Sequence, residues 1–364
     1  MDYYKEDAMR EELSYGDEKI IRAISPAEHI SEKHGSEYIY SYLDSHIEQF
    51  NRKVDEIERR CYDTKENPDE LLNIFTRAVK SLCFTCEEFE QAFGNDQAAI
   101  ADAQSDFRDK TNRHLMQSYF VNRARTWPQG YPGDYKTLED VYRNSPMSSG
   151  IGFYADRYFL ATTLAVGVRE RLATLTDILK EQLAKRSKPY ILNVACGSCR
   201  ELFEAAPEVK QSGAMITCID FDADALTFAS NRLAFTGIPQ ETILFRKYNA
   251  LKMVNQERNR REFGMQDIIY STGFFDYVED DVLIRLMRAA YDLLNPNGVL
   301  IASFKDCRRY QTQEYHWFVD WHGFLQRTED DMWALFDKAD IPRSLIETRR
   351  EKSEVIKFFI VTKH

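Results

Sequence analysis

The segment 189–202 joins a strand-like run to a helix-like run through a short turn of small residues. The run 191–194 is apolar and rich in β-formers, and it stops at the turn 195–199, Ala-Cys-Gly-Ser-Cys. Leu202, Phe203 and Ala205 then recur at helical spacing. A buried parallel strand passes into a helix in this way. Because small side chains let the backbone approach a ligand closely, the segment predicts a strand–turn–helix unit with a ligand at its turn.

A second strand-like run, 214–219, ends in Asp220, about 20 residues beyond the turn, where an acidic side chain can accept from ribose hydroxyls. Gly197 is the one glycine in the turn, so the G-x-G-x-x-G pattern that binds a dinucleotide pyrophosphate is absent. S-adenosylmethionine (SAM) is a nucleoside ligand that carries no phosphate. A turn that binds SAM therefore needs only small residues, such as Ala195 and Cys199, beside the ligand. The alternative is a buried strand and turn that bind no ligand.

Strand-like and helix-like segments continue to alternate after Asp220, which predicts a parallel sheet with right-handed crossovers and a ligand at the carboxyl ends of its strands. Thr328, with Asp331 three residues on, predicts a helix N-terminus. The predicted strands are 242–248, 266–270, 299–304 and 355–361, and the predicted helices among them are 224–235 and 282–293.

The 364 residues exceed the usual size of one domain, so we divide the chain into three parts. Residues 1–36 show little periodicity and are predicted to be loosely ordered. Residues 37–185 are helical in pattern, with 153–185 as one long helix, and residues 186–364 form the ligand-binding unit. The helical region is either a bundle that packs on the core or on a second subunit as a homodimer, or a lid with a substrate chamber.

Charge and composition limit the classes of partner. The formal net charge of −11 argues against general nucleic-acid binding, and we interpret the basic run 258–261 as a solvated loop. No apolar run approaches the ~18 residues of a membrane span, and the acidic N-terminus is unlike a signal peptide, so we expect a cytoplasmic protein.

Seven cysteines in such a chain suit reduced thiols. Two C-x-x-C pairs occur, Cys83 with Cys86 and Cys196 with Cys199. A zinc site would require the two pairs to meet. The first pair lies on a predicted helix and the second in the ligand turn, so we predict no metal.

The order of elements over residues 186–364 resembles the class I SAM-dependent methyltransferase fold, a Rossmann-like α/β fold with a seven-stranded sheet, here with a helical N-terminal extension. Over residues 125–364, the segments ILNVACGSCREL, YSTGFFDYVED, GYPGDYKTLEDVYR and FVDWHGFLQRTEDDM resemble a bacterial methyltransferase family that includes enzymes making the methyl ester of 3-hydroxypalmitate. The resemblance implies SAM as cofactor and S-adenosylhomocysteine (SAH) as product.

The resemblance also implies a cofactor site. It places the methionine part of SAM against Ala195, Gly197 and Cys199, the ribose on Asp220, the adenine beside Phe221, Asn249 and Ala250, and the transferring methyl beside Ser271, Thr272 and Gly273. Asn193 replaces the acidic residue common at its position, and its amide either orients the turn or accepts from the amino group of SAM.

The acceptor side is predicted from an aromatic turn and a few polar residues. Residues 127–135 hold two prolines, two glycines and three aromatics, which makes an ordered turn. We expect Tyr131 and Trp321 to be walls of the acceptor pocket, with Asp134 and Tyr135 beside them. Arg157 either holds a carboxylate by a bidentate contact or forms a surface pair with Asp156.

Two histidines are the candidate general bases. A carboxylate acceptor needs no base, whereas an amine, phenol or alcohol must lose a proton, for which His316 or His322 is the best placed in sequence. The alternative for both is that they pack as neighbours of aromatic residues.

We therefore predict a SAM-dependent methyltransferase that acts on the oxygen or nitrogen of a small-molecule acceptor, with a fatty-acid-like carboxylate as the acceptor that the resemblance suggests. Two alternatives remain. A protein side-chain methyltransferase would have an open acidic cleft. A non-catalytic SAM-fold scaffold would bind a partner through its N-terminal helices.

Overall fold

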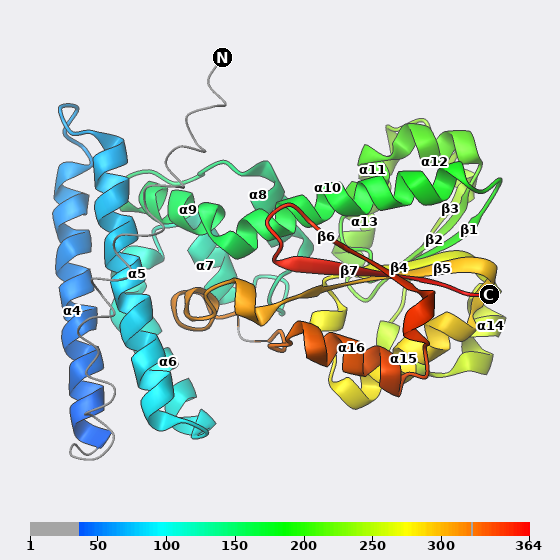
Figure 1. Cartoon of the computed structure of the whole chain (residues 1–364). Coiled ribbons are helices and arrows are strands. Elements are labelled where there is room, and N and C mark those ends of the chain that lie inside the picture. Colours follow the sequence, from blue (N-terminus) through cyan, green and yellow to red (C-terminus); the bar gives the residue numbers. More distant parts are fainter. Residues whose placement is uncertain (1–35, 322) are drawn as a thin grey trace.

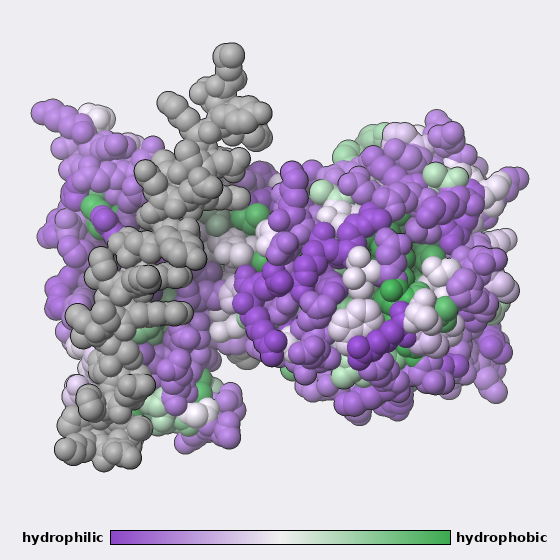
Figure 2. All heavy atoms as spheres, in the orientation of Figure 1, coloured by the Kyte–Doolittle hydropathy of each residue, from purple (hydrophilic) through white to green (hydrophobic). Residues whose placement is uncertain are grey.

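The computed structural model describes residues 36–321 and 323–364 (Figure 1). The predicted loose N-terminus, 1–36, lies outside the described residues except for Ser36, which opens the first described helix. Within the described part, no helix combines the length and the apolar character needed to cross a membrane. On the face shown in Figure 2, hydrophilic residues cover most of the described surface.

A seven-stranded sheet in the order β3-β2-β1-β4-β5-β7-β6 confirms the predicted fold class. The first five strands in this order are parallel, and β7 runs antiparallel to both of its neighbours. The prediction named no strand where β6 lies, because this edge strand has no buried residue and only Ile346 in it is apolar. The strands are β1 Tyr190–Val194, β2 Met215–Asp220, β3 Ile243–Lys247, β4 Gln266–Thr272, β5 Leu294–Lys305, β6 Ile346–Arg350 and β7 Ile356–Thr362.

Helices cover both faces of this sheet (Figure 1). Successive strand residues point to opposite faces, so Ile191 joins one apolar cluster and Leu192 the other. One face carries α10 (Thr163–Ala184), α11 (Arg200–Glu204), α12 (Ala206–Ser212) and α13 (Ala223–Ala234), and the other carries α14 (Gln256–Phe263), α15 (Asp280–Asp292) and α16 (Glu329–Lys338). The predicted cap of α16 is confirmed, because Thr328 and Asp331 bond each other's backbone N–H.

The basic run 258–261 lies within α14, so its interpretation as a loop was wrong. The Asn255 side chain accepts from the N–H of Arg258 and begins the helix, and Gly264 at φ 69° ends it. Arg258 also pairs with Glu262 at 2.8 Å, one turn on. These local contacts stabilise a short helix that its charge alone does not suggest.

Within the described residues, six helices precede α10 and form the helical region: α4 (Ser36–Arg60), α5 (Pro68–Phe93), α6 (Gln97–Leu115), α7 (Tyr119–Thr126), α8 (Tyr135–Arg143) and α9 (Ile151–Ala161). The segment after β5 enters this region. The Phe318 ring lies 5.8 Å from that of Phe50 and 4.9 Å from that of Phe107, and its carbonyl accepts from Arg125 at 2.7 Å. The helical region and the sheet unit thus share one core, and the predicted division into domains and the homodimer stay predictions.

The helix predicted over 153–185 is two helices that meet at Thr162. Thr162 has φ −59° and ψ 151°, which is extended rather than helical. Its hydroxyl donates to the Phe159 carbonyl at 2.8 Å and lies 2.6 Å from the Tyr315 hydroxyl. The break lets α9 pack in the helical region while α10 runs along the sheet (Figure 1).

Short helical turns complete the described chain: η1 Gln240–Thr242, η2 Ala250–Val254, η3 Phe275–Tyr277, η4 Cys307–Arg309, η5 Glu314–Phe318 and η6 Arg343–Leu345.

The carboxylate of Glu139 on α8 ties the helical region to the turn after β1. It accepts from the Ser198 hydroxyl at 2.7 Å and from both terminal nitrogens of Arg232 at 2.6 and 2.5 Å, and Arg200 approaches it at 3.3 Å. The Glu139 and Arg232 side chains are only 11% and 14% exposed. Burial works to raise the pKa of Glu139, but the bonds from Arg232 and Ser198 prevail and hold it below its usual range.

We expect Glu139→Gln to lower the free energy of unfolding by about 3 kcal/mol, because it leaves the largely enclosed guanidinium of Arg232 without its counter-charge. The measurement is urea unfolding at pH 7. The pKa of Glu139 is lowered on folding. The ionised carboxylate therefore adds to the free energy of unfolding at neutral pH, and this stabilisation is lost as the pH falls through the folded pKa.

The control is Glu48→Gln, which removes an exposed pair with Arg52 and should cost less than about 1 kcal/mol. Equal losses in the two variants would contradict the role given to Glu139.

Candidate active site

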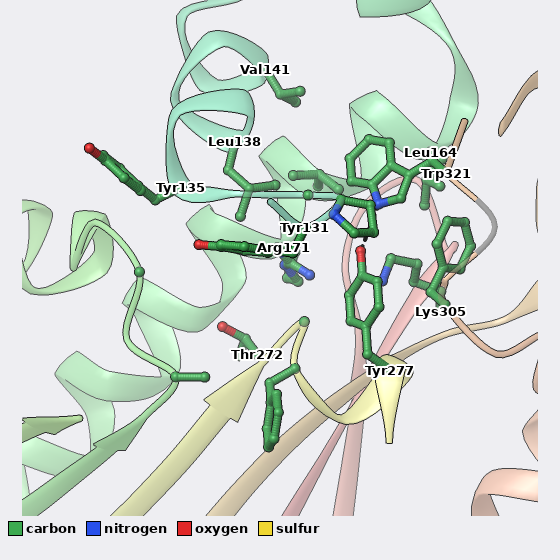
Figure 3. A pocket seen from close by; sticks show the side chains of 18 of the residues that line it. Tyr131, Tyr135, Leu138, Val141, Leu164, Arg171, Thr272, Tyr277, Lys305 and Trp321 are labelled. Atoms are coloured by element: carbon green, nitrogen blue, oxygen red, sulfur yellow. Dashed lines mark hydrogen bonds between the residues drawn. The ribbon is translucent and has the colours of Figure 1, made fainter. Parts of the chain in front are cut away.

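A cavity of about 300 Å³ lies where the carboxyl ends of β1, β2 and β4 meet the helical region (Figure 3). Residues from both parts of the chain line it. The sheet unit contributes Ala195, Gly197, Asp220, Phe221, Tyr248, Asn249, Ala250, Thr272, Gly273, Phe274, Tyr277, Lys305, Tyr315, Trp321 and Phe324, and the preceding region contributes Phe120, Tyr131, Pro132, Gly133, Tyr135, Leu138, Val141, Phe159, Leu164, Ala165, Val168 and Arg171.

The turn after β1 is held in a specific backbone shape by Asp220. Ala195, Gly197 and Cys199 have φ of 55°, 52° and 48°, and such values are costly for a residue other than glycine. The Gly197 N–H donates to Asp220 Oδ2 at 2.9 Å, and the Asp222 N–H donates to Oδ1 at 3.0 Å. Each carboxylate oxygen can accept a further bond, so Asp220 fits the ribose role.

Burial raises the pKa of Asp220, although backbone N–H donors from Asp222 and Gly197 oppose the rise. The carboxylate is 7% exposed and lines the cavity. A ligand that supplies hydroxyl donors would stabilise its ionised form.

Three predicted cofactor residues do not line the cavity. The Asn193 amide donates to Glu201 Oε1 at 2.9 Å, so it orients the helix beyond the turn. The Ser271 hydroxyl donates to the Val194 carbonyl at 2.9 Å and ties β4 to β1. The Cys199 thiol is buried against Cys218, with the two sulfurs 3.7 Å apart. The remaining predicted cofactor residues, Ala195, Gly197, Asp220, Phe221, Asn249, Ala250, Thr272 and Gly273, line the cavity together.

Tyr131 lies on the cofactor side of the cavity. Its hydroxyl donates to Asp222 Oδ2 at 2.9 Å, and its ring centre is 4.9 Å from that of Phe221, which is 54% exposed. The turn predicted to wall the acceptor pocket therefore also covers the position expected for the nucleoside. Tyr135 lines the cavity, and its ring lies 5.3 Å from that of Phe228.

Trp321 and Tyr277 form the opposite wall (Figure 3). The Trp321 indole N–H donates to the Tyr277 hydroxyl at 2.8 Å. A Cβ at Gly133 would lie 2.7 Å from that hydroxyl and 2.8 Å from the Trp321 ring, so glycine is required there. Asp134 does not line the cavity, because its buried carboxylate caps α8 and pairs with Arg123 at 2.5 Å.

Neither of the two described residues that were predicted as catalytic, Arg157 and His316, lines the cavity. Arg157 pairs with Asp69 at 3.2 Å, while the neighbouring Asp156 is buried and accepts from backbone N–H groups. The His316 ring lies 6.2 Å from that of Phe324, outside the lining. His322 lies outside the described residues.

The structure instead brings Arg171 and Lys305 to the cavity, and neither was among the predicted site residues. Arg171 on α10 is 4% exposed, and a Cβ at Gly273 would lie only 2.8 Å from its Nη1 (Figure 3). No carboxylate of the described residues pairs with Arg171, whereas Lys305 pairs with the buried Asp276. The available signal was a cation on the apolar stripe that Leu164, Val168 and Leu175 mark on α10.

Burial lowers the pKa of Lys305, Asp276 opposes that change, and the nearby Arg171 adds to it. Of these two cations, Lys305 has a carboxylate partner in Asp276 and Arg171 has none among the described residues, which leaves a net positive charge at this end of the cavity. Such a charge attracts an anion.

Comparisons with known proteins agree with this geometry. Residues 192–300 match a family described as a methyltransferase domain. No curated protein sequence matches the chain. Among solved structures, a possible exported protein from Bordetella parapertussis is similar with a TM-score of 0.53 at 16% identity, over 93% of this chain and 99% of that one.

The magnesium protoporphyrin IX methyltransferase ChlM from Synechocystis PCC 6803 with bound SAH is similar with a TM-score of 0.41 at 11% identity, over 56% of this chain and 86% of that one. These likenesses concern the fold. The matched domain spans the turn, Asp220 and the end of β4, and it makes this chain a methyltransferase of the EC 2.1.1 class with SAM as its cofactor.

Proposed function

We propose that the enzyme transfers the methyl group of SAM to the carboxylate of an apolar small molecule and so makes a methyl ester. The observation that carries the proposal is Arg171, a buried guanidinium that lines the cavity without a carboxylate partner among the described residues. A buried cation is costly unless it is paired. An acceptor carboxylate would supply the missing charge.

The position of Arg171 suits this acceptor. Its Nη1 lies beside Gly273, in the segment where β4 ends and where we place the transferring methyl. A planar guanidinium can hold a carboxylate by two parallel bonds, which orients one oxygen. The reacting oxygen would then be set by the same residue that supplies the charge.

The remainder of the acceptor side is apolar. Its lining includes aliphatic and aromatic side chains of the helical region and of the segment after β5: Phe120, Leu138, Val141, Phe159, Leu164, Val168 and Phe324. An aliphatic or aromatic body would gain from burial against these groups. The chemistry of the cavity therefore supports an acceptor with an anionic head and an apolar body, as a fatty acid has.

The reaction needs positioning more than proton transfer. When bound, SAM supplies an electrophilic methyl group on its sulfonium. A carboxylate oxygen forms the new C–O bond while the C–S bond breaks in line with it, and no proton moves. This suits a lining in which no described histidine takes part. Arg171 holds the acceptor, Asp220 holds the ribose, and Trp321 and Tyr277 exclude water.

The lining also bears on the protein side-chain alternative. Asp220 is the one carboxylate among the described lining residues, and the ribose occupies it in our assignment. An arginine side chain as acceptor would need further acidic groups to receive its charge. The cavity thus favours a small anionic acceptor over a cationic protein side chain.

Asp220→Asn should weaken SAM binding about tenfold, or ~1.4 kcal/mol, because an ionised ribose acceptor is lost. Since burial raises the pKa of Asp220, wild-type affinity for SAM should fall as the pH drops through that pKa, and the variant should lose this dependence. The measurement is calorimetric titration with SAM and SAH across pH.

The matched control is Asp224→Asn, an exposed change four residues away. It should leave both affinity and pH profile as in wild type. Parallel profiles for wild type and Asp220→Asn would refute the ribose assignment.

Arg171→Gln should lower kcat/KM for a carboxylate acceptor roughly 100-fold while SAM affinity stays unchanged, since it removes the charge that holds the acceptor. The assay follows labelled methyl from SAM into saturated carboxylic acids of graded length, with primary alcohols and amines of equal length beside them. A methyl ester product is recognised by its release of methanol in base.

Arg169→Gln is the control, because Arg169 lies on the same helix and bonds the Leu160 carbonyl at 2.9 Å outside the cavity lining. Transfer to amines in preference to acids, or equal losses in the two variants, would overturn the proposed acceptor.

A further inference from the structure

Three thiols from two elements meet behind the cofactor turn. Cys196 and Cys199 belong to the turn, and Cys218 lies on β2. Their sulfurs all lie within 4.8 Å of one another, and those of Cys199 and Cys218 are 3.7 Å apart. The three residues are 7%, 0% and 0% exposed, and all are free thiols.

The backbone brings these thiols together. The parallel register of β1 and β2 sets Cys218 beside Asn193, at the base of the turn. The left-handed backbone at Cys199, with φ 48°, turns its side chain back against β2 rather than toward the cavity. The two C-x-x-C pairs of the sequence do not supply this group, because the third thiol comes from a single cysteine on the next strand.

The distances between the three sulfurs suit one metal ion bound by all of them. Metal–sulfur bonds of about 2.3 Å place sulfurs about 3.8 Å apart around a tetrahedral centre and about 4.0 Å apart around a trigonal one. The observed separation of 3.7 Å and upper limit of 4.8 Å require only small shifts of side chains to reach either arrangement. Three sulfur ligands select a soft cation.

The number of ligands also limits which metal ion fits the site. A structural zinc ion takes four ligands, and no fourth His, Cys, Asp or Glu of the described chain joins this group. Three sulfurs without a fourth ligand fit monovalent copper, which accepts trigonal thiolate coordination. Each thiol that binds the ion releases its proton, because the thiolate is the form of cysteine that binds a metal.

We propose that Cys196, Cys199 and Cys218 form a binding site for monovalent copper, separate from the SAM and acceptor subsites. Binding would join the turn to β2 through sulfur. The neighbouring Ala195 and Gly197 line the cofactor cavity, so the bound ion would fix the left-handed backbone on which SAM rests. The inference does not depend on the identity of the methyl acceptor.

The test titrates the full-length, reduced protein with cuprous ion without oxygen and in competition with bicinchoninate as a coloured chelator. We expect one copper ion per chain and a thiolate-to-copper absorbance in the ultraviolet. Cys218→Ser should weaken binding at least tenfold, and Cys196→Ala should do the same if the first variant folds poorly. Circular dichroism and SAM titration report on folding.

The matched control is the double variant Cys83→Ser and Cys86→Ser, which removes the buried C-x-x-C pair of α5 and should retain the bound copper. The proposal is overturned if wild type does not compete with the chelator. It is equally overturned if the α5 double variant loses the ion while folded Cys218→Ser and Cys196→Ala both keep it.

Discussion

A buried guanidinium with no carboxylate partner among the described residues is the constraint around which this molecule is arranged. Arg171 is 4% exposed and forms no ion pair with a carboxylate of the described residues, while the nearby Lys305 pairs with the buried Asp276. Burying such a charge costs free energy that a structural role does not repay. The helices, the turn and the segment after β5 all contribute walls around this side chain, so the cost is concentrated where an anionic acceptor can offset it.

The helix α8 connects the two halves of the cavity. Leu138 and Val141 line the acceptor side, while Glu139 on the same helix bonds Ser198 in the cofactor turn. A movement of α8 would therefore change the acceptor chamber and the turn together. Tyr131, just before α8, adds a second link through Asp222. The contacts of α8 and Tyr131 thus join the apolar part of the cavity and the cofactor turn in one arrangement.

Sequence patterns predicted the sheet and much of the cofactor side because these depend on local signals. Apolar runs, the small-residue turn and Asp220 are contiguous in the chain, and most of the residues inferred from them line one cavity. The break at Thr162, the inclusion of residues 258–261 in a helix and the third thiol at Cys218 depend on contacts between distant segments. Arg171 was not predicted, because it lies within an apolar stripe that we interpreted only as a packing surface.

The most direct test of the acceptor assignment is a calorimetric titration of the SAH complex with a medium-chain carboxylic acid, its primary amide and its methyl ester. The three ligands share their apolar body and differ in charge at the head. We expect the carboxylate to bind at least about tenfold more tightly than the amide, or ~1.4 kcal/mol, with the ester weakest. Equal affinities for acid and amide would show that Arg171 does not receive an anion, and would contradict the proposed reaction.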